Sequence, residues 1–266
     1  MKYAKSIITG SALLIGISSF YGQCGTQPSA AQKEENAPIW ADEFNTNGAP
    51  DSLKWGYDIG NGNNGWGNAE AQYYTSRPEN VEVSDGTLKI KAIKEDYNGS
   101  AYTSARLLTK GKFDFTYGRV EVRAKLPAGK GTWPAIWLLG SNVDKAGWPE
   151  CGEIDIMEHA GNRQNKIDGT VHYPGGYGAN GPTYFTTLTD ASENFHVYAL
   201  DWSPTVIKWY VDGKEFSSFD NNKDIPFNHD FFVLLNFAVG GSFGGLIDPA
   251  FTGGVFEVDY VRVYKN

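Results

Sequence analysis

The ten residues Gly118-Arg-Val-Glu-Val-Arg-Ala-Lys-Leu-Pro127 decide the fold class. Their apolar side chains (Val120, Val122, Ala124 and Leu126) alternate with charged ones, so one face of an extended strand is apolar and the other polar. Pro127 closes the strand, because proline donates no hydrogen bond to a sheet. Alternating runs of this kind recur along the chain without any long helical period, which predicts an all-β protein.

Turn residues separate further strands. Ser203-Pro204 lies between the runs 195–202 and 206–211, and Asp212-Gly213 follows as a hairpin turn. Phe231–Val239 is nearly all apolar, as in a strand buried on both faces. Strict alternation gives the last strand apolar groups on both faces, which places it inside a sheet; one face carries Val255, Glu257, Asp259, Val261 and Val263. The pattern predicts one domain, residues 39–266, folded as a two-sheet jelly-roll sandwich.

Composition excludes several classes of protein. The chain has 266 residues, 41% of them hydrophobic, which rules out a disordered chain. A net charge of −8 without a basic cluster excludes nucleic-acid binding, and two cysteines cannot build a disulfide scaffold or a cysteine-rich zinc site. The 8 Trp, 15 Tyr and 15 Phe favour flat, uncharged, ring-shaped ligands.

The N-terminus is predicted to be a signal peptide, residues 1–23, followed by a flexible tether, residues 24–38. Lys2 and Lys5 precede an apolar stretch too short to span a bilayer, so we expect export from a bacterium. Two fates stay open: a lipid anchor on Cys24 at the cell envelope, or ordinary cleavage near Gln23 and secretion. Cleavage changes the net charge from −8 to −10, because two lysines and no acids leave. Cys151 is then expected to be a small buried residue.

The stretch Cys151-Gly-Glu-Ile-Asp-Ile-Met-Glu-His159 carries three acids. Residues two apart on a strand face the same way, so Glu153 and Asp155 share a face. Strict alternation would turn Glu158 into the core, where an unpaired charge is costly. We therefore predict a β-bulge near Met157, which returns Glu158 to the acidic face.

Two carboxyl groups about 5–5.5 Å apart are the apparatus of a retaining glycosidase, one as nucleophile and the other as acid and base. Here these are Glu153 and Glu158, and the charge of Asp155 between them raises the pKa of the acid. The alternative is that the three acids form the solvated face of an ordinary surface strand. This is disfavoured, because three neighbouring carboxylates repel one another and need a functional reason to be there. A zinc site is disfavoured, because His159 points away from the acids and the chain lacks a His-x-x-x-His pattern.

Tryptophans suited to a sugar cleft accompany the acids. Trp133 and Trp137 are four residues apart and share a strand face, while Ile136 and Leu138 supply the face toward the core. Two other tryptophans are candidates for the cleft (Trp66 and Trp148), and three are expected in the core (Trp40, Trp202 and Trp209).

His172 alternates with apolar neighbours in Thr170-Val-His-Tyr173. It is either a core histidine or a residue of a strand beside the acids. In the second case it hydrogen-bonds a sugar hydroxyl or tunes Asp155.

The segment Gly152-Glu-Ile-Asp-Ile-Met-Glu-His-Ala160 resembles the active-site signature of glycoside hydrolase family 16, in the form with the extra Met that is typical of laminarinases. The resemblance covers nearly all the mature chain. Further matching stretches are Trp40–Asn45, Gln72–Thr75, Arg77–Asn80, Ser104–Arg106, Gly118–Arg123, Trp133–Trp137, Phe195–Tyr198 and Asp259–Tyr264. Such a likeness implies a curved, concanavalin-like jelly roll with a concave substrate cleft.

The resemblance also implies residue roles. Glu153 matches the nucleophile, Glu158 the acid/base and Asp155 the assisting acid. Positions that commonly line the sugar subsites are matched by Asn64, Arg106, Trp133, Trp137 and His172. No cofactor is implied for catalysis. Many members bind a structural Ca²⁺ on the convex side, where Asp259 would be the side-chain ligand and Glu43 and Gly86 would offer backbone oxygens.

Two departures from the family pattern bear on specificity: Ala71 stands where Leu is frequent, and Ser242-Phe243 where Asn-Trp is frequent. The expected activity is endo-hydrolysis of β-1,3-glucan by a monomer. Alternatives are the same chemistry on mixed-linkage β-1,3-1,4-glucan or a marine galactan, and a non-catalytic carbohydrate-binding protein. The extra Met, the acidic charge and the presence of both glutamates favour the first.

Overall fold

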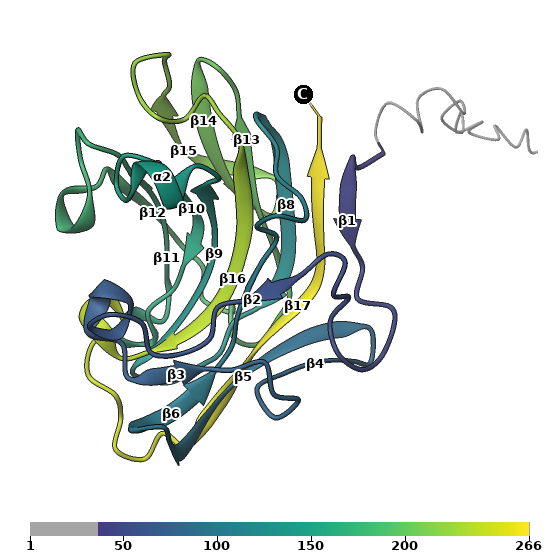
Figure 1. Ribbon diagram of the computed structural model, residues 1–266, viewed down its shortest axis with the longest axis vertical. Coiled ribbons are helices and arrows are strands. Elements are labelled where there is room, and N and C mark those ends of the chain that lie inside the picture. The colour runs from purple at the N-terminus through teal and green to yellow at the C-terminus, as the bar shows by residue number, and fades with distance from the viewer. Residues whose placement is uncertain (1–36, 266) are drawn as a thin grey trace, which may run out of the picture. The chain divides into compact units, whose positions relative to one another are not determined.

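Two curved, mostly antiparallel sheets lie face to face in the computed structural model, which describes residues 37–265 (Figure 1). The predicted signal peptide and nearly all of the predicted tether lie outside the described residues. No helix within residues 37–265 is long and apolar enough to cross a membrane.

The outer, convex sheet has its strands in the order β15-β14-β13-β8-β17-β5-β6-β3, with β1 paired to β17 and β4 to β5. Their bounds are β1 Trp40–Asp42, β3 Gln72–Tyr74, β4 Val81–Ser84, β5 Thr87–Tyr97, β6 Ser100–Ser104, β8 Gly118–Lys125, β13 His196–Trp202, β14 Val206–Val211, β15 Lys214–Asp220 and β17 Gly253–Tyr264. Strand β17 lies inside this sheet, as its two apolar faces predict.

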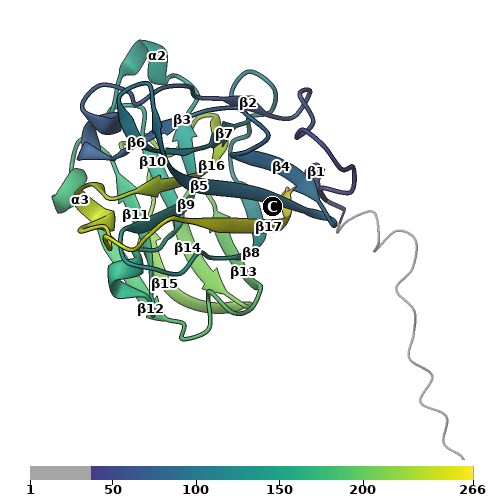
Figure 2. The same cartoon turned by 90° about the horizontal axis from the view of Figure 1, so that it is seen from below.

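The inner, concave sheet has the order β12-β11-β10-β9-β16-β7-β2. Its strands are β2 Gly56–Tyr57, β7 Arg106–Leu108, β9 Thr132–Gly140, β10 Glu153–Glu158, β11 Lys166–His172, β12 Thr183–Thr187 and β16 Phe231–Val239. Short helical turns decorate the loops: η1 Gly65–Ala69, α2 Val143–Ala146, η2 Gly161–Arg163, η3 Gly178–Asn180 and α3 Gly241–Gly244. Turned by 90°, the molecule shows η1 and α3 close together at one edge (Figure 2).

The core fills the space between the sheets. In β8 the predicted alternation is complete: buried and half-buried residues follow one another along the strand. Trp202 and Trp209 are fully buried, as predicted, while Trp40 is half-buried and packs against the core. Cys151 is a buried free thiol, again as predicted.

The predicted bulge is present in β10. Asp155 pairs with Trp137 on β9 and Met157 with Ile136, so one extra residue stands between them. Ile156 and Met157 are both buried in the core. Two consecutive side chains therefore enter the core, and the strand resumes alternation with Glu158 on the other side.

A second bulge, in β17, overturns one expectation. Phe256 and Val258 are buried in the core together with Val261 and Val263, although strict alternation separates the two pairs. The pairing of β17 with β8 shifts between Val258 and Tyr260, which changes the parity of the strand. The prediction that Val255 to Val263 share one face is therefore wrong beyond Asp259.

Strand β11 approaches the core closely at Gly169. A Cβ atom there would lie 2.6 Å from Cδ1 of Trp209, whose Nε1–H donates to the Asp155 carbonyl at 2.8 Å. Only glycine leaves room for this indole, and the indole satisfies a carbonyl beside the bulge.

We expect Gly169→Ala to destabilise the fold by about 1–3 kcal/mol, because the new methyl group overpacks Trp209. Gly56→Ala in β2 is the matched control, since its nearest neighbour would lie 3.6 Å away, and its effect should stay within about 0.5 kcal/mol. Denaturant unfolding of the two variants measures the difference; equal effects would contradict the close-packing argument.

Candidate active site

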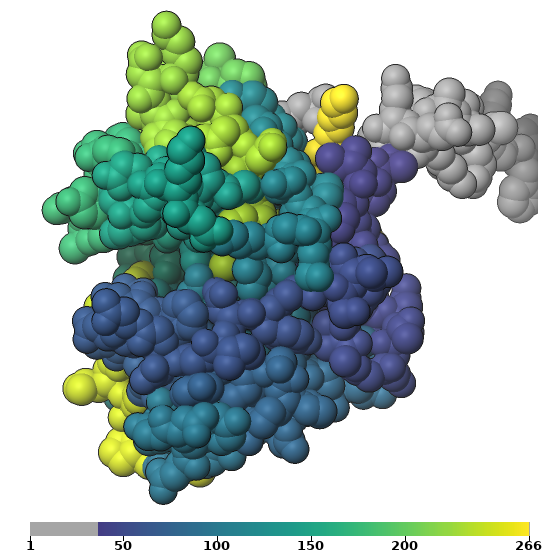
Figure 3. All heavy atoms as spheres, in the orientation of Figure 1, coloured from purple at the N-terminus to yellow at the C-terminus, as the bar shows by residue number. Residues whose placement is uncertain are grey.

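The catalytic strand β10 lies between β9 and β11 in the concave sheet. On β9, Glu153 pairs with Leu139 and Glu158 with Ala135; on β11 the same acids pair with His172 and Asp168. Because Ile154, Ile156 and Met157 are buried in the core, the three acids point to the concave face. This face is hollowed between the blue segment around η1 and the teal and green loops opposite it (Figure 3).

Indole and imidazole groups surround the carboxyl groups. Trp148 Nε1 donates to Glu153 Oε2 at 3.0 Å, and Trp133 Nε1 donates to Glu158 Oε1 at 3.0 Å. His172 Nε2 lies 3.2 Å from Asp155 Oδ2 and 3.6 Å from Glu153 Oε1. His172 thus lies beside the acids, which decides between its two predicted positions.

The backbone sets the tautomer of His172. The Gly178 N–H donates to His172 Nδ1 at 3.1 Å, so in the neutral ring the proton is on Nε2, the nitrogen that lies near the acids. Among the described residues, Glu153, Asp155 and His172 form the one group of three or more His, Cys, Asp or Glu side chains whose ligand atoms all lie within 4.8 Å of one another. A metal at Nε2 would require the opposite tautomer, with a donor at Nδ1, so this cluster is built to hold a proton.

Burial raises the pKa of Glu153, Asp155 and Glu158, each to about 8. The charge of Asp155 raises the pKa of both glutamates further, while His172 lowers it. A hydrogen bond with Glu153 lowers the pKa of Asp155. Carboxylates this close do not all ionise together, so the cluster retains protons at neutral pH. The acid of a retaining glycosidase needs such a proton.

Arg106 stands between two tryptophans at the wall of the site. Its guanidinium carbon lies 4.7 Å from the ring centres of both Trp66 and Trp137, and its Nε is 2.9 Å from Asp58 Oδ2. Trp137 in turn donates from Nε1 to Asn236 Oδ1 at 2.7 Å. The cation therefore ties the η1 loop to β9.

The two departures from the family pattern lie near Trp133. The Phe243 ring, in α3, packs 5.2 Å from the Trp133 ring at an interplanar angle of 37°. Ala71 is half-buried against the core and lies beside Gly240, just before α3. An aromatic ring is thus kept at position 243, in contact with an indole that binds Glu158.

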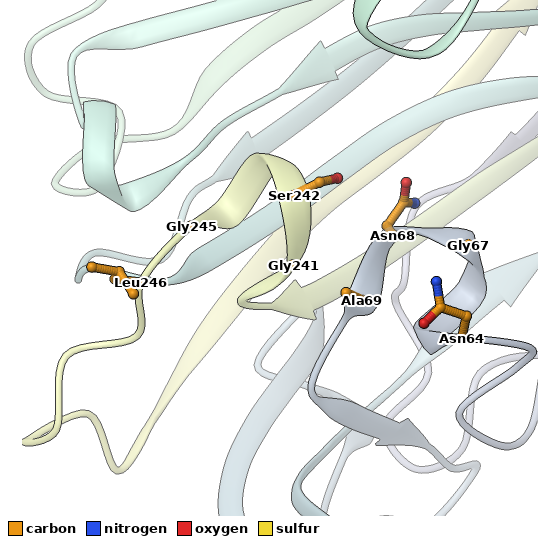
Figure 4. A pocket seen from close by; sticks show the side chains of 8 residues that line it. All are labelled: Asn64, Gly67, Asn68, Ala69, Gly241, Ser242, Gly245 and Leu246. Carbon is orange, nitrogen blue, oxygen red and sulfur yellow. The ribbon is translucent and has the colours of Figure 1, made fainter.

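Asn64 lies on the rim, away from the catalytic strand. It lines a pocket of about 540 Å³ between η1 and α3 (Figure 4). The other lining residues are Gly67, Asn68, Ala69, Gly241, Ser242, Gly245 and Leu246. The Asn64 and Asn68 amides and the Ser242 hydroxyl can form hydrogen bonds in this pocket, and the exposed Leu246 lies beside them.

Several residues of the site were not predicted; three of them contact predicted ones. Asp58 binds Arg106, Asn236 binds Trp137, and Tyr177 meets Trp148 edge-on with ring centres 5.5 Å apart. Asn236 had a signal in the sequence, because it is the one polar residue in the apolar run Phe231–Val239. Asp58 and Tyr177 lie in loops and carried none.

The residues of the predicted calcium site gather beside β17. Asp42 pairs with Val261, so the next residue, Glu43, lies close to Asp259. Leu88 pairs with Val258, which brings the turn at Gly86 to the same part of β17. The Asp259 carboxylate is paired with Arg123, and the Glu43 carboxylate with Arg262. Oxygen ligands suit Ca²⁺, but the ion takes about six to eight of them, so these three would supply only part of its shell and Asp259 would be shared with the arginine.

The raised pKa values predict a pH-dependent stability. Glu153 takes up its proton more readily when folded than when unfolded, so its contribution is complete below about pH 4.5 and is lost as the pH rises through about 8. Glu153→Gln removes this loss. We therefore expect the melting temperature of the variant, relative to the parent, to increase between pH 4.5 and 9. The exposed control Glu215→Gln should show no such trend, and a pH-independent difference for Glu153→Gln would contradict the burial argument.

Comparison with known proteins agrees with this geometry. A family model described as "Glycosyl hydrolases family 16" matches residues 68–262. The "Beta-glucanase" of Rhodothermus marinus is 43% identical over 264 residues, which cover 91% of this chain and 91% of that protein. The solved laminarinase of R. marinus has a TM-score of 0.81 and 45% identity, over 86% of this chain and 97% of that one. A Z. galactanivorans protein in complex with laminaritriose and laminaritetraose has a TM-score of 0.80 and 42% identity, over 86% and 99%. This chain therefore belongs to glycosyl hydrolase family 16.

Proposed function

We propose that this protein hydrolyses internal β-1,3-glucosidic bonds of laminarin-type β-glucans with retention of configuration. The observation that carries the proposal is the bulge of β10, which sets Glu153 and Glu158 on one face beneath a wall of tryptophans. The solved complex of a 42% identical protein with laminaritriose and laminaritetraose supports the choice of glucan.

The first step uses Glu153 as the nucleophile. Its carboxylate attacks the anomeric carbon, the glycosidic bond breaks, and Glu158 gives its proton to the leaving oxygen. Trp148 Nε1–H and the nearby His172 Nε2–H stabilise the charge of Glu153 before attack. Burial and Asp155 keep Glu158 protonated until that moment. No cofactor takes part.

The second step returns both groups to their starting states. Glu158, now a carboxylate, takes a proton from water, and the hydroxyl attacks the anomeric carbon and releases Glu153. Trp133 Nε1–H donates to Glu158 throughout and so fixes its position. Asp155 lies beside Glu153 and His172, and its charge acts on the pKa of both glutamates during the reaction.

Products formed from four polysaccharides test the substrate and the reaction. We expect the full chain to release oligosaccharides from laminarin faster than from lichenan, agarose or carrageenan, as followed by chromatography. Glu153→Gln should lower turnover by roughly 10³-fold or more, because the amide is a poor nucleophile, while laminarin still binds.

Three outcomes of this assay decide between the candidates. Faster turnover of lichenan or of a galactan would assign the same chemistry to the alternative substrate. Binding without turnover by the unmodified chain would identify a carbohydrate-binding protein. Retained activity in Glu153→Gln, with Glu215→Gln as the surface control, would overturn the role of the nucleophile.

We also propose a structural Ca²⁺ held by Asp259 and by the backbone oxygens of Glu43 and Gly86. The convergence of these residues beside the β17 bulge supports it. Chelation with EDTA should lower the melting temperature of the full chain, and Asp259→Asn should remove this sensitivity. An unchanged thermal transition after chelation would refute the site.

Export by residues 1–23 remains part of the proposal, with either a lipid on Cys24 or release into the medium. A substrate too large to cross a membrane supports an extracellular place of action. The acidic mature charge suits a neutral glucan, and we expect a monomer.

A further inference from the structure

A fourth acid lies on the concave face beside the catalytic strand. Asp168, on β11, is the cross-strand partner of Glu158, and its side chain is only 1% exposed. Side chains of directly opposed residues start about 4.5–5.5 Å apart at Cβ. Ile167 and Val171 point into the core, so Asp168 shares the concave side with His172. The reaction described above gives Asp168 no role.

Two cations hold this buried carboxylate. Lys166 Nζ lies 2.8 Å from Asp168 Oδ1, and a terminal nitrogen of Arg163 lies 3.5 Å from Asp168 Oδ2. Arg163 also lies over the Phe243 ring, at 4.6 Å from its centre. Phe243 packs on the Trp133 ring and Trp133 donates to Glu158, so a chain of contacts connects the Asp168 ion pairs with the acid/base.

We propose that Asp168 is a positioning residue for Glu158: its caged carboxylate sets how firmly Glu158 holds the proton that it gives to the leaving oxygen. The inference rests on the proposed role of Glu158 and deepens it. Asp168 touches no reacting atom and acts only through its neighbour.

The charges around Glu158 determine the sign of the effect. Asp155 on β10 and Asp168 on β11 raise its pKa, while His172 on β11 and the hydrogen bond from Trp133 on β9 lower it. The side chains of β12 and α3 that face Asp168 or its cations are uncharged, Phe185 and Phe243. His159, in the core behind the strand, has its own pKa lowered by burial and is neutral near pH 7. Lys166 and Arg163 pair with Asp168 itself, so they set how much of its negative charge reaches Glu158.

Removal of the negative charge of Asp168 should therefore lower the pKa of Glu158. We expect Asp168→Asn to lower the pKa of Glu158 by less than about one pH unit, because the negative charge of Asp168, which raises that pKa, is lost. Arg163→Gln should move it in the opposite direction by less, since that guanidinium is 41% exposed and screened. Asp168→Glu keeps the charge and should restore the parent value.

The measurement is a ¹³C carboxyl NMR titration of the full chain labelled at glutamate, with the Glu158 signal assigned by its absence in Glu158→Gln. The alkaline limb of kcat/KM on laminarin should shift in parallel. Asp201→Asn is the matched control, because it removes an acid paired with Arg119 on the convex sheet and should leave the titration of Glu158 unchanged.

The outcomes separate this inference from the proposed function. An unchanged Glu158 titration in Asp168→Asn, or a downward shift in Arg163→Gln, overturns the role of Asp168 even if the enzyme is active. If Asp168→Asn does not fold, the direction of the shift in Arg163→Gln decides. Absence of turnover on every glucan refutes the activity alone, since the titration needs no substrate.

Discussion

The site depends on one irregularity of hydrogen bonding, the bulge of β10. A regular strand would put Glu158 in the core or pull Ile156 out of it. The bulge turns the two consecutive side chains of Ile156 and Met157 inward, so both are buried in the core and the three acids stay on one face. The price is a disturbed ladder, and the Trp209 indole compensates by binding the Asp155 carbonyl from the core side.

Burial of these acids creates the electrostatic condition for the proposed chemistry. In water both glutamates would lose their protons near pH 4.5, whereas in the cleft burial and the charge of Asp155 raise the pKa of Glu158, so the acid keeps its proton. His172 and the Trp148 N–H favour the ionised form of Glu153. The cluster is tolerated because each of the two glutamates receives an indole N–H and His172 Nε2 lies 3.2 Å from Asp155. Two tryptophans thus act as hydrogen-bond donors as well as walls of the cleft.

The β10 bulge was predictable because a charge at the wrong parity is expensive, and the sequence placed Glu158 there. The β17 bulge was not predictable, because apolar residues occupy both faces of that strand. With or without a bulge, a valine such as Val258 or Val261 can enter the core. The pairing of Trp137 with Asn236 spans 99 residues, and no local pattern encodes such a distance. Strand order and loop contacts, such as that of Tyr177 with Trp148, likewise arise only when the chain folds.

The composition of the rim then constrains how this chain holds a sugar beyond the acids. The Phe243 ring packs against Trp133 and against Arg163, so it serves as part of the wall around Glu158 and is not a free stacking platform. The neighbouring pocket offers Asn64, Asn68 and Ser242, whose groups form hydrogen bonds. This rim therefore offers amide and hydroxyl groups beside apolar surface, whereas Trp148, 45% exposed beside Glu153, keeps an aromatic surface open.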